Sequence, residues 1–215
     1  MEPTAAELRV LGCLIEKQRA TPESYPLSVN ALRLACNQAT NRDPVVDYDE
    51  DTVREALGRL RQRRWARLAS GSGGRAPKYR HLLEEALSLA SPETSLLAVL
   101  MLRGPQTPGE LKQRTERLHS FAGLAELEAT LERLVDRELV ERLERRPGQK
   151  EVRYVQLLGG GAEPSERAPA VAAATPFAEE PAAAAEDLSA RLDRLEGEVG
   201  SLREELAVLA RGLER

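Results

Sequence analysis

The sequence predicts a mainly α-helical fold with small β wings: two tandem winged helix-turn-helix domains and a C-terminal heptad helix that forms a coiled coil. Residues 49–83 carry apolar side chains at helical spacing, followed by two strand-like runs on either side of a glycine-rich loop. The same order recurs in residues 91–158. Residues 187–215 carry leucines at alternating spacings of four and three, which is the heptad pattern.

Composition limits the class of protein. The chain has 215 residues, of which 41% are hydrophobic but only 3% aromatic, so leucine, valine and alanine must build the interior. Cys13 and Cys36 lack the number and spacing of a disulfide framework or a zinc site, and no motif indicates a cofactor. No apolar run approaches the roughly 20 residues that span a bilayer, and the N-terminus has no signal-like core. We therefore expect a soluble cytoplasmic protein that does not enter a membrane.

The first domain is predicted over residues 1–83. Thr4 and Glu7 form a capping box that starts its first helix, and Ser28 has the position of an N-cap for the second helix. In that second helix we expect three apolar side chains to face inward: Val29, Leu32 and Leu34. Asp49 is the expected cap of the third helix, 49–63, after which strands over 65–68 and 78–83 flank the loop 70–77.

A helical connector is expected over residues 84–90 and the second domain over residues 91–158. The apolar residues of the two third helices correspond at one constant offset: Val53, Leu57, Leu60 and Trp65 to Leu127, Leu131, Leu134 and Leu139. Tyr79 and Tyr154 correspond after a single-residue slip in the loop, and Thr107 with Glu110 forms another capping box. We interpret the chain as an internal duplication, in which each copy has its own interior.

The last two segments are predicted to be a linker and an oligomerisation helix. Residues 159–186 are rich in Ala, Pro and Glu, which predicts a disordered linker. The helix 187–215 has one apolar seam, formed by Leu188, Leu192, Leu195, Val199, Leu202, Leu206, Leu209 and Leu213. In a parallel pair, Arg191 attracts Glu196 and Glu198 attracts Arg203. A homo-oligomer, expected to be a dimer, follows from this pattern, although the leucines leave a trimer open. A single amphipathic helix docked on the body is the other interpretation.

Basic residues concentrate in one part of the first domain. Residues 53–81 contain nine Arg or Lys and one acid, a net charge of +8, in a chain whose formal net charge is −4. The candidate nucleic-acid-binding residues lie on the third helix and the wing: Arg54, Arg59, Arg61, Arg63, Arg64, Arg75, Lys78 and Arg80. In a helix-turn-helix, the third helix enters the major groove and flanking basic side chains hold phosphates. Residues 127–154 carry seven basic and seven acidic residues, so the second domain is expected to pack against protein instead.

The N-terminal end of the third helix opposes this interpretation in part. It carries acids at positions 47, 49, 50 and 51, which would repel a phosphate backbone. Contact with the DNA backbone is therefore expected more than reading of base edges. The other interpretation of the basic residues is a solvated face that compensates the dipole at the C-terminal end of the helix.

A polar segment follows the second helix and contains Asn37, Gln38, Asn41 and Arg42. Their side chains could form a site for a polar ligand or a partner. The other interpretation, which the residue types favour, is that they satisfy hydrogen bonds of turns and caps.

Three segments carry a resemblance to a known family. “LRVLGCLIEK”, “TPESYPLSVNALRLACNQATNRDP” and “LRGPQTPGELKQRTERLHSF” resemble the signatures of the YceH-like family, which are bacterial tandem winged-helix proteins of unestablished biochemical role. The resemblance covers residues 7 to about 158 and leaves the linker and the heptad outside. It implies the fold and brings no catalytic residues with it.

The sequence contains no pattern of residues that indicates an enzyme. His81 and His119 are the only histidines, neither has a carboxylate or thiol at a telling spacing, and there is no P-loop or dinucleotide motif. We expect a non-enzymatic, DNA-associated regulatory protein that contacts the backbone of double-stranded DNA through the third helix and wing of the first domain. The alternative is an interaction scaffold of winged-helix modules that binds a protein partner and no DNA.

Overall fold

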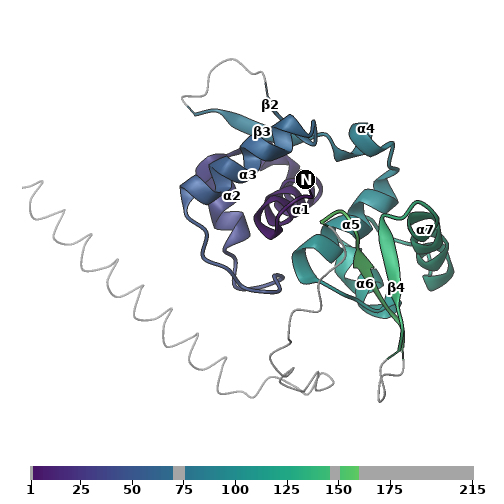
Figure 1. The fold of residues 1–215 in the computed structure, drawn as a ribbon. Helices are drawn as coiled ribbons and strands as arrows, with labels where there is room; N and C mark the ends of the chain where they lie inside the picture. Colours follow the sequence, from purple (N-terminus) through teal and green to yellow (C-terminus); the bar gives the residue numbers. More distant parts are fainter. Residues whose placement is uncertain (1, 70–75, 146–150, 160–215) are drawn as a thin grey trace, which may run out of the picture. The chain divides into compact units, whose positions relative to one another are not determined.

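A computed structural model describes residues 2–69, 76–145 and 151–159 (Figure 1). The first half of the chain contains α1 (Ala5–Ala20), η1 (Pro22–Ser24), β1 (Leu27–Ser28), α2 (Val29–Cys36), α3 (Glu50–Gln62), β2 (Ala66–Leu68) and β3 (Lys78–His81). The connector contains α4 (Leu83–Leu87). The second half contains α5 (Ser91–Arg103), α6 (Pro108–Thr115), α7 (Leu124–Asp136), β4 (Val140–Leu143) and β5 (Arg153–Gln156). The described part is therefore mainly α-helical with small antiparallel sheets, as predicted.

Side-chain caps start α1, α2, α3 and α6 at the predicted residues. The Thr4 hydroxyl accepts from the backbone N–H of Glu7 at 3.3 Å, and the Glu7 carboxylate accepts from the N–H of Thr4 at 3.3 Å. Thr107 and Glu110 repeat this capping box in front of α6. Ser28 caps α2 and Asp49 caps α3. Each cap satisfies donors that a helix N-terminus would otherwise leave unpaired.

The helices α3 and α7 bury equivalent faces. The corresponding apolar residues are all almost completely buried: Val53, Leu57 and Leu60 on α3, and Leu127, Leu131 and Leu134 on α7. In α2 one inward prediction is wrong, because Leu34 is 57% exposed while Leu32 is fully buried. Two residues apart on a helix lie on nearly opposite sides, so α2 cannot bury both of these leucines against α1 and α3.

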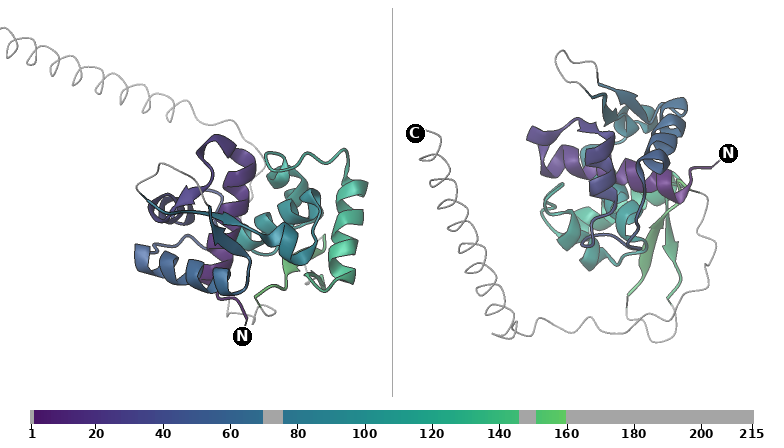
Figure 2. Two further views of the ribbon diagram at one scale, coloured as in Figure 1. Left: turned by 90° about the horizontal axis from the view of Figure 1, so that it is seen from above. Right: turned by 90° about the vertical axis from the view of Figure 1, so that its left-hand side faces the viewer.

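Each half also has an antiparallel two-stranded ribbon (Figure 2), to which the first half adds the short strand β1 and the second half a single isolated bridge. β2 pairs with β3, with Leu68 opposite Tyr79, and β1 pairs with the other edge of β3, with Leu27 opposite Tyr79. β4 pairs with β5, and Gln106 forms an isolated bridge to Tyr154 on the other edge of β5. Leu27 and Gln106 thus occupy equivalent places in front of a capped helix. Neither β1 nor this bridge was predicted, because a segment of one or two residues has no detectable periodicity.

The two halves share one core. The buried side chains of both halves form one continuous apolar cluster, in which α1 packs against α5. Gly12 lies at this contact, since a Cβ there would meet Leu102 Cγ at 2.9 Å. The expectation of a separate interior for each copy is therefore wrong. α1 and α5 are buried on almost every side and so need a partner on the face that a surface helix would leave to solvent.

Candidate nucleic-acid interface

The N-terminal end of α3 is acidic, and its own arginine is neutralised. Asp49 accepts from the N–H of Thr52 at 2.8 Å, and this hydrogen bond lowers the pKa of the Asp49 carboxyl. Arg54 forms ion pairs with Glu50 and with Asp51, the latter at 2.8 Å between Nη1 and Oδ1. Carboxylates therefore dominate the end of α3 from which a recognition helix usually reads bases.

Arg59 of α3 and Arg63, the residue that caps its C-terminal end, anchor the helix to α1. Arg59 Nη1 lies 3.7 Å from Glu7 Oε1 and Arg63 Nε lies 3.2 Å from Glu7 Oε2. The Glu7 side chain is 1% exposed, so its charge needs these partners. The same arrangement recurs in the second half, where the buried Glu93 pairs with Arg133 at 3.7 Å and Arg137 at 3.6 Å. Arg59 and Arg63 thus have a structural role that the duplication repeats.

The arginines at the C-terminal end of α3 and in the following strand β2 differ from those earlier in α3, because they have no carboxylate partner in the described part of the chain. Arg61, Arg64 and Arg67 are exposed, and none of them has an ion pair or a hydrogen bond through its side chain within the described residues. They line one open pocket of about 760 Å³, together with Gly58, Gln62 and Leu82. None of the residues that line this pocket is a carboxylate. Such a concave cationic surface suits an anion such as a phosphate.

The backbone places Arg64 at the turn between α3 and β2. Arg64 has φ 62°, in the left-handed region, and the N–H of Trp65 donates to the carbonyl of Leu60 at 2.9 Å. This is a helix C-cap that reverses the chain into the strand. It also places Arg64 between Arg61 on the helix and Arg67 on the strand, so the three residues border the same pocket.

The wing contributes fewer described candidates. Lys78 is exposed, and Arg80 Nη2 forms an ion pair with Glu85 Oε1 at 3.1 Å. Arg75 lies outside the described residues. Of the eight candidates, the structure brings together Arg61 and Arg64 at the pocket, whereas Arg54, Arg59, Arg63 and Arg80 have carboxylate partners.

One pocket residue is absent from the predicted candidates, although the sequence carries a signal for it. Arg67 belongs to the basic stretch of the first half. Ala66 is buried in β2 and Arg67 is exposed, which is the alternation of a strand with one face on the core. The anchoring function of Glu7 had no local signal beyond its capping box, because its arginine partners lie far along the chain.

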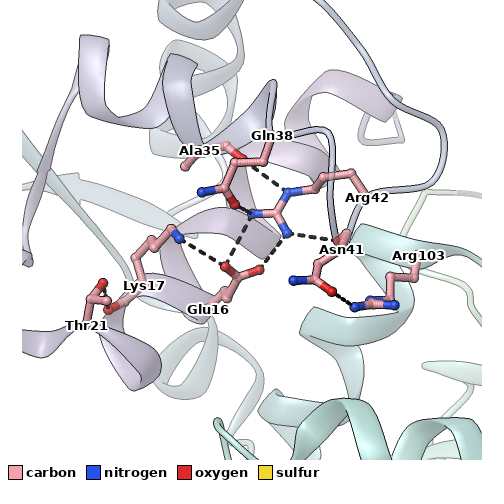
Figure 3. Close-up of polar contacts among 8 residues, drawn as sticks. All are labelled: Glu16, Lys17, Thr21, Ala35, Gln38, Asn41, Arg42 and Arg103. Carbon is pink, nitrogen blue, oxygen red and sulfur yellow. Dashed lines mark hydrogen bonds and ion pairs between the residues drawn. The ribbon is translucent and has the colours of Figure 1, made fainter. Parts of the chain in front are cut away.

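The polar segment after α2 is held by internal contacts (Figure 3). Arg42 is buried and donates to Glu16 Oε2 at 2.7 Å, to Gln38 Oε1 at 2.9 Å and to the carbonyl of Ala35 at 3.1 Å. Asn41 accepts from Arg103 of α5. Asn37 accepts from the N–H of Tyr48 at 2.9 Å and donates to its carbonyl at 2.8 Å. These contacts fix the long loop before α3 and give all four polar residues partners within the protein.

The two histidines lie in different surroundings. His81 is buried, with its Nε2 on Gln18 Oε1 and its Nδ1 accepting from the N–H of Leu83 at 3.3 Å. Burial lowers the pKa of His81 to about 4, so the ring is neutral at pH 7. His119 packs edge-on against Phe121 with ring centroids 4.7 Å apart.

The described residues offer neither a metal site nor a membrane span. No group of three or more His, Cys, Asp or Glu residues is placed to hold a metal ion among them. In the same ranges, every helix is too short or too polar to cross a bilayer. The oligomerisation residues Leu188, Leu192, Leu195, Val199, Leu202, Leu206, Leu209 and Leu213, and the linker before them, lie outside the described residues.

Comparison with known proteins identifies the family. Residues 4–149 match the family described as “Protein of unknown function, DUF480”. A UPF0502 protein of Pelobacter propionicus is 51% identical over 207 residues, covering 95% of this chain and 92% of the relative. The UPF0502 protein YceH of Salmonella paratyphi A is 45% identical over 212 residues, covering 95% of this chain and 94% of the relative. A UPF0502 protein of Geotalea daltonii is 56% identical over 156 residues, or 72% of this chain and 71% of the relative.

The longer matches also correct one expectation. An alignment of 207 residues cannot fit within the first 158, so the resemblance to relatives extends into the linker and the heptad segment. With a matched family segment of this length and relatives of this identity, the chain belongs to the YceH-like family of UPF0502 proteins.

Proposed function

We propose that this chain is a non-enzymatic, DNA-associated regulatory protein of the cytoplasm. Its two halves are winged helix-turn-helix modules, and the C-terminal end of α3 with β2 and β3 grips the phosphate backbone of a duplex. The observation that carries the proposal is the pocket lined by Arg61, Arg64 and Arg67, which lacks carboxylates and whose arginines have no partner in the described protein. Exposed cations that are not used internally are available to a polyanion.

The distribution of charge along α3 favours backbone contact over base reading. The acidic N-terminal end, with Arg54 neutralised by Glu50 and Asp51, would repel phosphate. The cationic end lies at the other end of the helix and continues into β2, which carries Arg67. A duplex held at this end contacts the protein through its phosphates, which position a protein without specifying sequence.

The test is the triple variant Arg61→Ala, Arg64→Ala and Arg67→Ala, measured by fluorescence anisotropy with a duplex of mixed sequence. We expect affinity to fall at least about tenfold at low salt, and the slope of log K against log salt to shrink by about 0.9 for each phosphate that the variant no longer neutralises. The matched control removes the same charge from the second half: Arg117→Ala, Arg142→Ala and Arg145→Ala, all at exposed positions. Its affinity should stay near that of the unchanged protein.

Equal reductions of affinity in the two triple variants would show that only net charge matters and would refute a defined interface at this pocket. Binding of no duplex by the unchanged protein, together with capture of a protein partner that survives nuclease treatment, would favour the interaction scaffold instead.

We also propose that residues 187–215 form a parallel coiled coil that makes the protein a dimer. The heptad seam and the attractive flanking charges support this proposal. Deletion of residues 188–215 should convert a dimer into a monomer in analytical ultracentrifugation. The same mass in both samples would contradict the coiled coil without affecting the DNA test, which can be made on either protein.

A further inference from the structure

The cationic pocket between α3 and β2 is larger than a single phosphate group requires. The two elements lie next to each other (Figure 1), and the pocket has a volume of about 760 Å³. Small-molecule sites occupy roughly 300–1,000 Å³. Besides the three arginines, the lining contains a glycine, an amide and three apolar side chains: Gly58, Gln62, Ala66, Leu68 and Leu82. A phosphate backbone would use the arginines and leave most of the other lining uncovered.

The apolar part of the lining is accessible beside the unpaired charges. Leu68 follows Arg67 in β2 and is 40% exposed, and Leu82, which follows β3, is half-buried. Apolar surface of this kind is stabilised when another apolar group covers it. A ligand with both an apolar face and phosphates would cover the leucines and neutralise the arginines together.

Gly58 leaves one wall of the pocket open. It lies inside α3, where glycine is among the least favourable residues for a helix. A Cβ at this position would meet no atom within 4 Å, and the backbone is not left-handed, so neither packing nor conformation requires a glycine. The corresponding residue of α7 is Glu132. The effect of the glycine is therefore to keep space free beside the arginines.

A nucleotide has the chemistry that this lining would bind. Guanidinium groups bind phosphate oxygens in a bidentate manner, and they also stack on the faces of bases. Gln62 is exposed, and its side chain makes no hydrogen bond within the described ranges. Its amide can donate to and accept from the edge of a base at the same time. Leu68 and Leu82 offer apolar surface to the base and the sugar.

We propose that the pocket lined by Arg61, Arg64 and Arg67 binds a nucleoside 5′-diphosphate or 5′-triphosphate, which excludes the DNA backbone from the same arginines. The phosphates bind the arginines, and the base lies over Leu68 with its edge towards Gln62. The nucleotide is then an effector that releases DNA. Exclusion of DNA rests on the proposed function, whereas nucleotide binding itself does not.

The test measures binding of ADP, GDP, CDP and UDP to the full chain by isothermal titration calorimetry at fixed ionic strength. Inorganic pyrophosphate and the four nucleosides are the reference probes. We expect at least one nucleotide to bind at least about tenfold more tightly than pyrophosphate, because only the nucleotide covers the apolar lining. The nucleosides lack the phosphates and should bind at least about tenfold more weakly than that nucleotide. Pyrophosphate binding as tightly as all four nucleotides, or no binding of any of them at millimolar concentration, would overturn the proposal.

Gly58→Gln tests the place of the nucleotide, because the new side chain fills the open wall. Its affinity for the nucleotide should fall at least about tenfold, while its thermal midpoint should rise, since glutamine favours a helix more than glycine does. The matched control is Gly109→Gln in α6, where a Cβ also meets no atom within 4 Å. That variant should bind the nucleotide as the unchanged protein does. A Gly58→Gln protein with undiminished affinity would show that the nucleotide does not bind in this pocket.

Exclusion of DNA is measured by anisotropy with the labelled duplex. At a free nucleotide concentration ten times its own Kd, the apparent Kd of the duplex should rise about elevenfold, and pyrophosphate at the same concentration and ionic strength should raise it less. A nucleotide that binds without changing the affinity for the duplex would refute the exclusion. A protein that binds nucleotide and no duplex would keep this site and lose the DNA function. A protein that binds duplex through the three arginines and no nucleotide would lose this inference alone.

Discussion

The two halves of the described protein have the same backbone at the end of their third helices and opposite charges on it. Arg64 and Glu138 occupy equivalent turns with φ 62° and 55°. The N–H of Trp65 donates to the carbonyl of Leu60 at 2.9 Å, and that of Leu139 donates to the carbonyl of Leu134 at 3.0 Å. The left-handed residue is therefore a requirement of the turn, whichever side chain it carries.

The side chains on the surface around these turns differ between the two halves. Positions Arg61, Arg64 and Arg67 of the first half correspond to Val135, Glu138 and Glu141 in the second half. The anchoring pairs do not differ, since Glu7 and Glu93 each bind two arginines of the following third helix. The arginines that pair with Glu7 therefore have a role in the fold that both halves share. The arginines at positions 61, 64 and 67 occur only in the first half and are available to a ligand.

The largest expected effect concerns whether the halves unfold together. Leu131→Ala in α7 removes a fully buried side chain of the second half and should cost about 2–5 kcal/mol of unfolding free energy. Trp65, the single tryptophan, belongs to the first half and reports on that half alone. Because the core is continuous, we expect the urea midpoint from Trp65 fluorescence to fall together with the midpoint from circular dichroism.

The control for that experiment is Leu57→Ala, the equivalent change beside Trp65 in the first half. Both variants should shift both signals. A Trp65 transition that stays in place when Leu131 is truncated would restore the view of two independent domains.

An intermediate effect is expected in acid from His81, whose equivalent in the second half is Gln156. Native His81 has a pKa lowered to about 4 by burial, whereas the unfolded chain binds this proton near pH 6.5. The stabilisation is present above about pH 6.5 and is lost as the pH falls towards about 4. Relative to His81→Gln, the unchanged protein should lose about 2 kcal/mol of unfolding free energy between pH 7 and about pH 4.5.

Urea titrations of the two proteins at each pH measure this difference. Carboxylates elsewhere contribute equally to both proteins and cancel. A difference in unfolding free energy that is the same at both pH values would mean that native His81 protonates as readily as the unfolded chain.

An effect of similar size is expected at the two anchors, and the smallest effect is expected at their surface control. Glu7→Gln and Glu93→Gln each remove a buried charge from two arginines and should cost about 1.5–3 kcal/mol, the usual range for hydrogen bonds to charged groups. Glu55→Gln is the matched control, because its side chain is 72% exposed and its pair with Arg59 lies on the surface. That change should cost less than about 0.5 kcal/mol in thermal unfolding. A Glu7→Gln variant no less stable than the control would show that the anchor is dispensable.

Much of the fold could be predicted from local patterns. The periodicity of Val53, Leu57 and Leu60 and the capping boxes at Thr4 and Thr107 concern contacts within one or two helical turns, and such signals are strong. The sharing of one core was not predictable in this way. α1 and α5 are apolar nearly all round, which indicates burial but does not name the helix that covers the extra face.

The candidate interface was predictable in charge but not in detail. A count of basic residues cannot separate Arg59 and Arg63, whose partner Glu7 lies far earlier in the chain, from Arg61 and Arg64 in the same short stretch. Helical phase offers a partial signal, because residues four apart share a face and Arg59 and Arg63 are so spaced.

The close approach of α1 and α5 at Gly12 has a practical consequence for dissecting this protein. A fragment that stops near residue 89 would expose the whole flank of α1 that α5 normally covers, and a fragment that starts there would expose the reciprocal flank. Such fragments are expected to stick to each other or to aggregate, because large uncovered apolar patches do not persist on soluble monomers. If the two fragments were expressed separately and mixed, we expect them to bind each other through the apolar contact between α1 and α5.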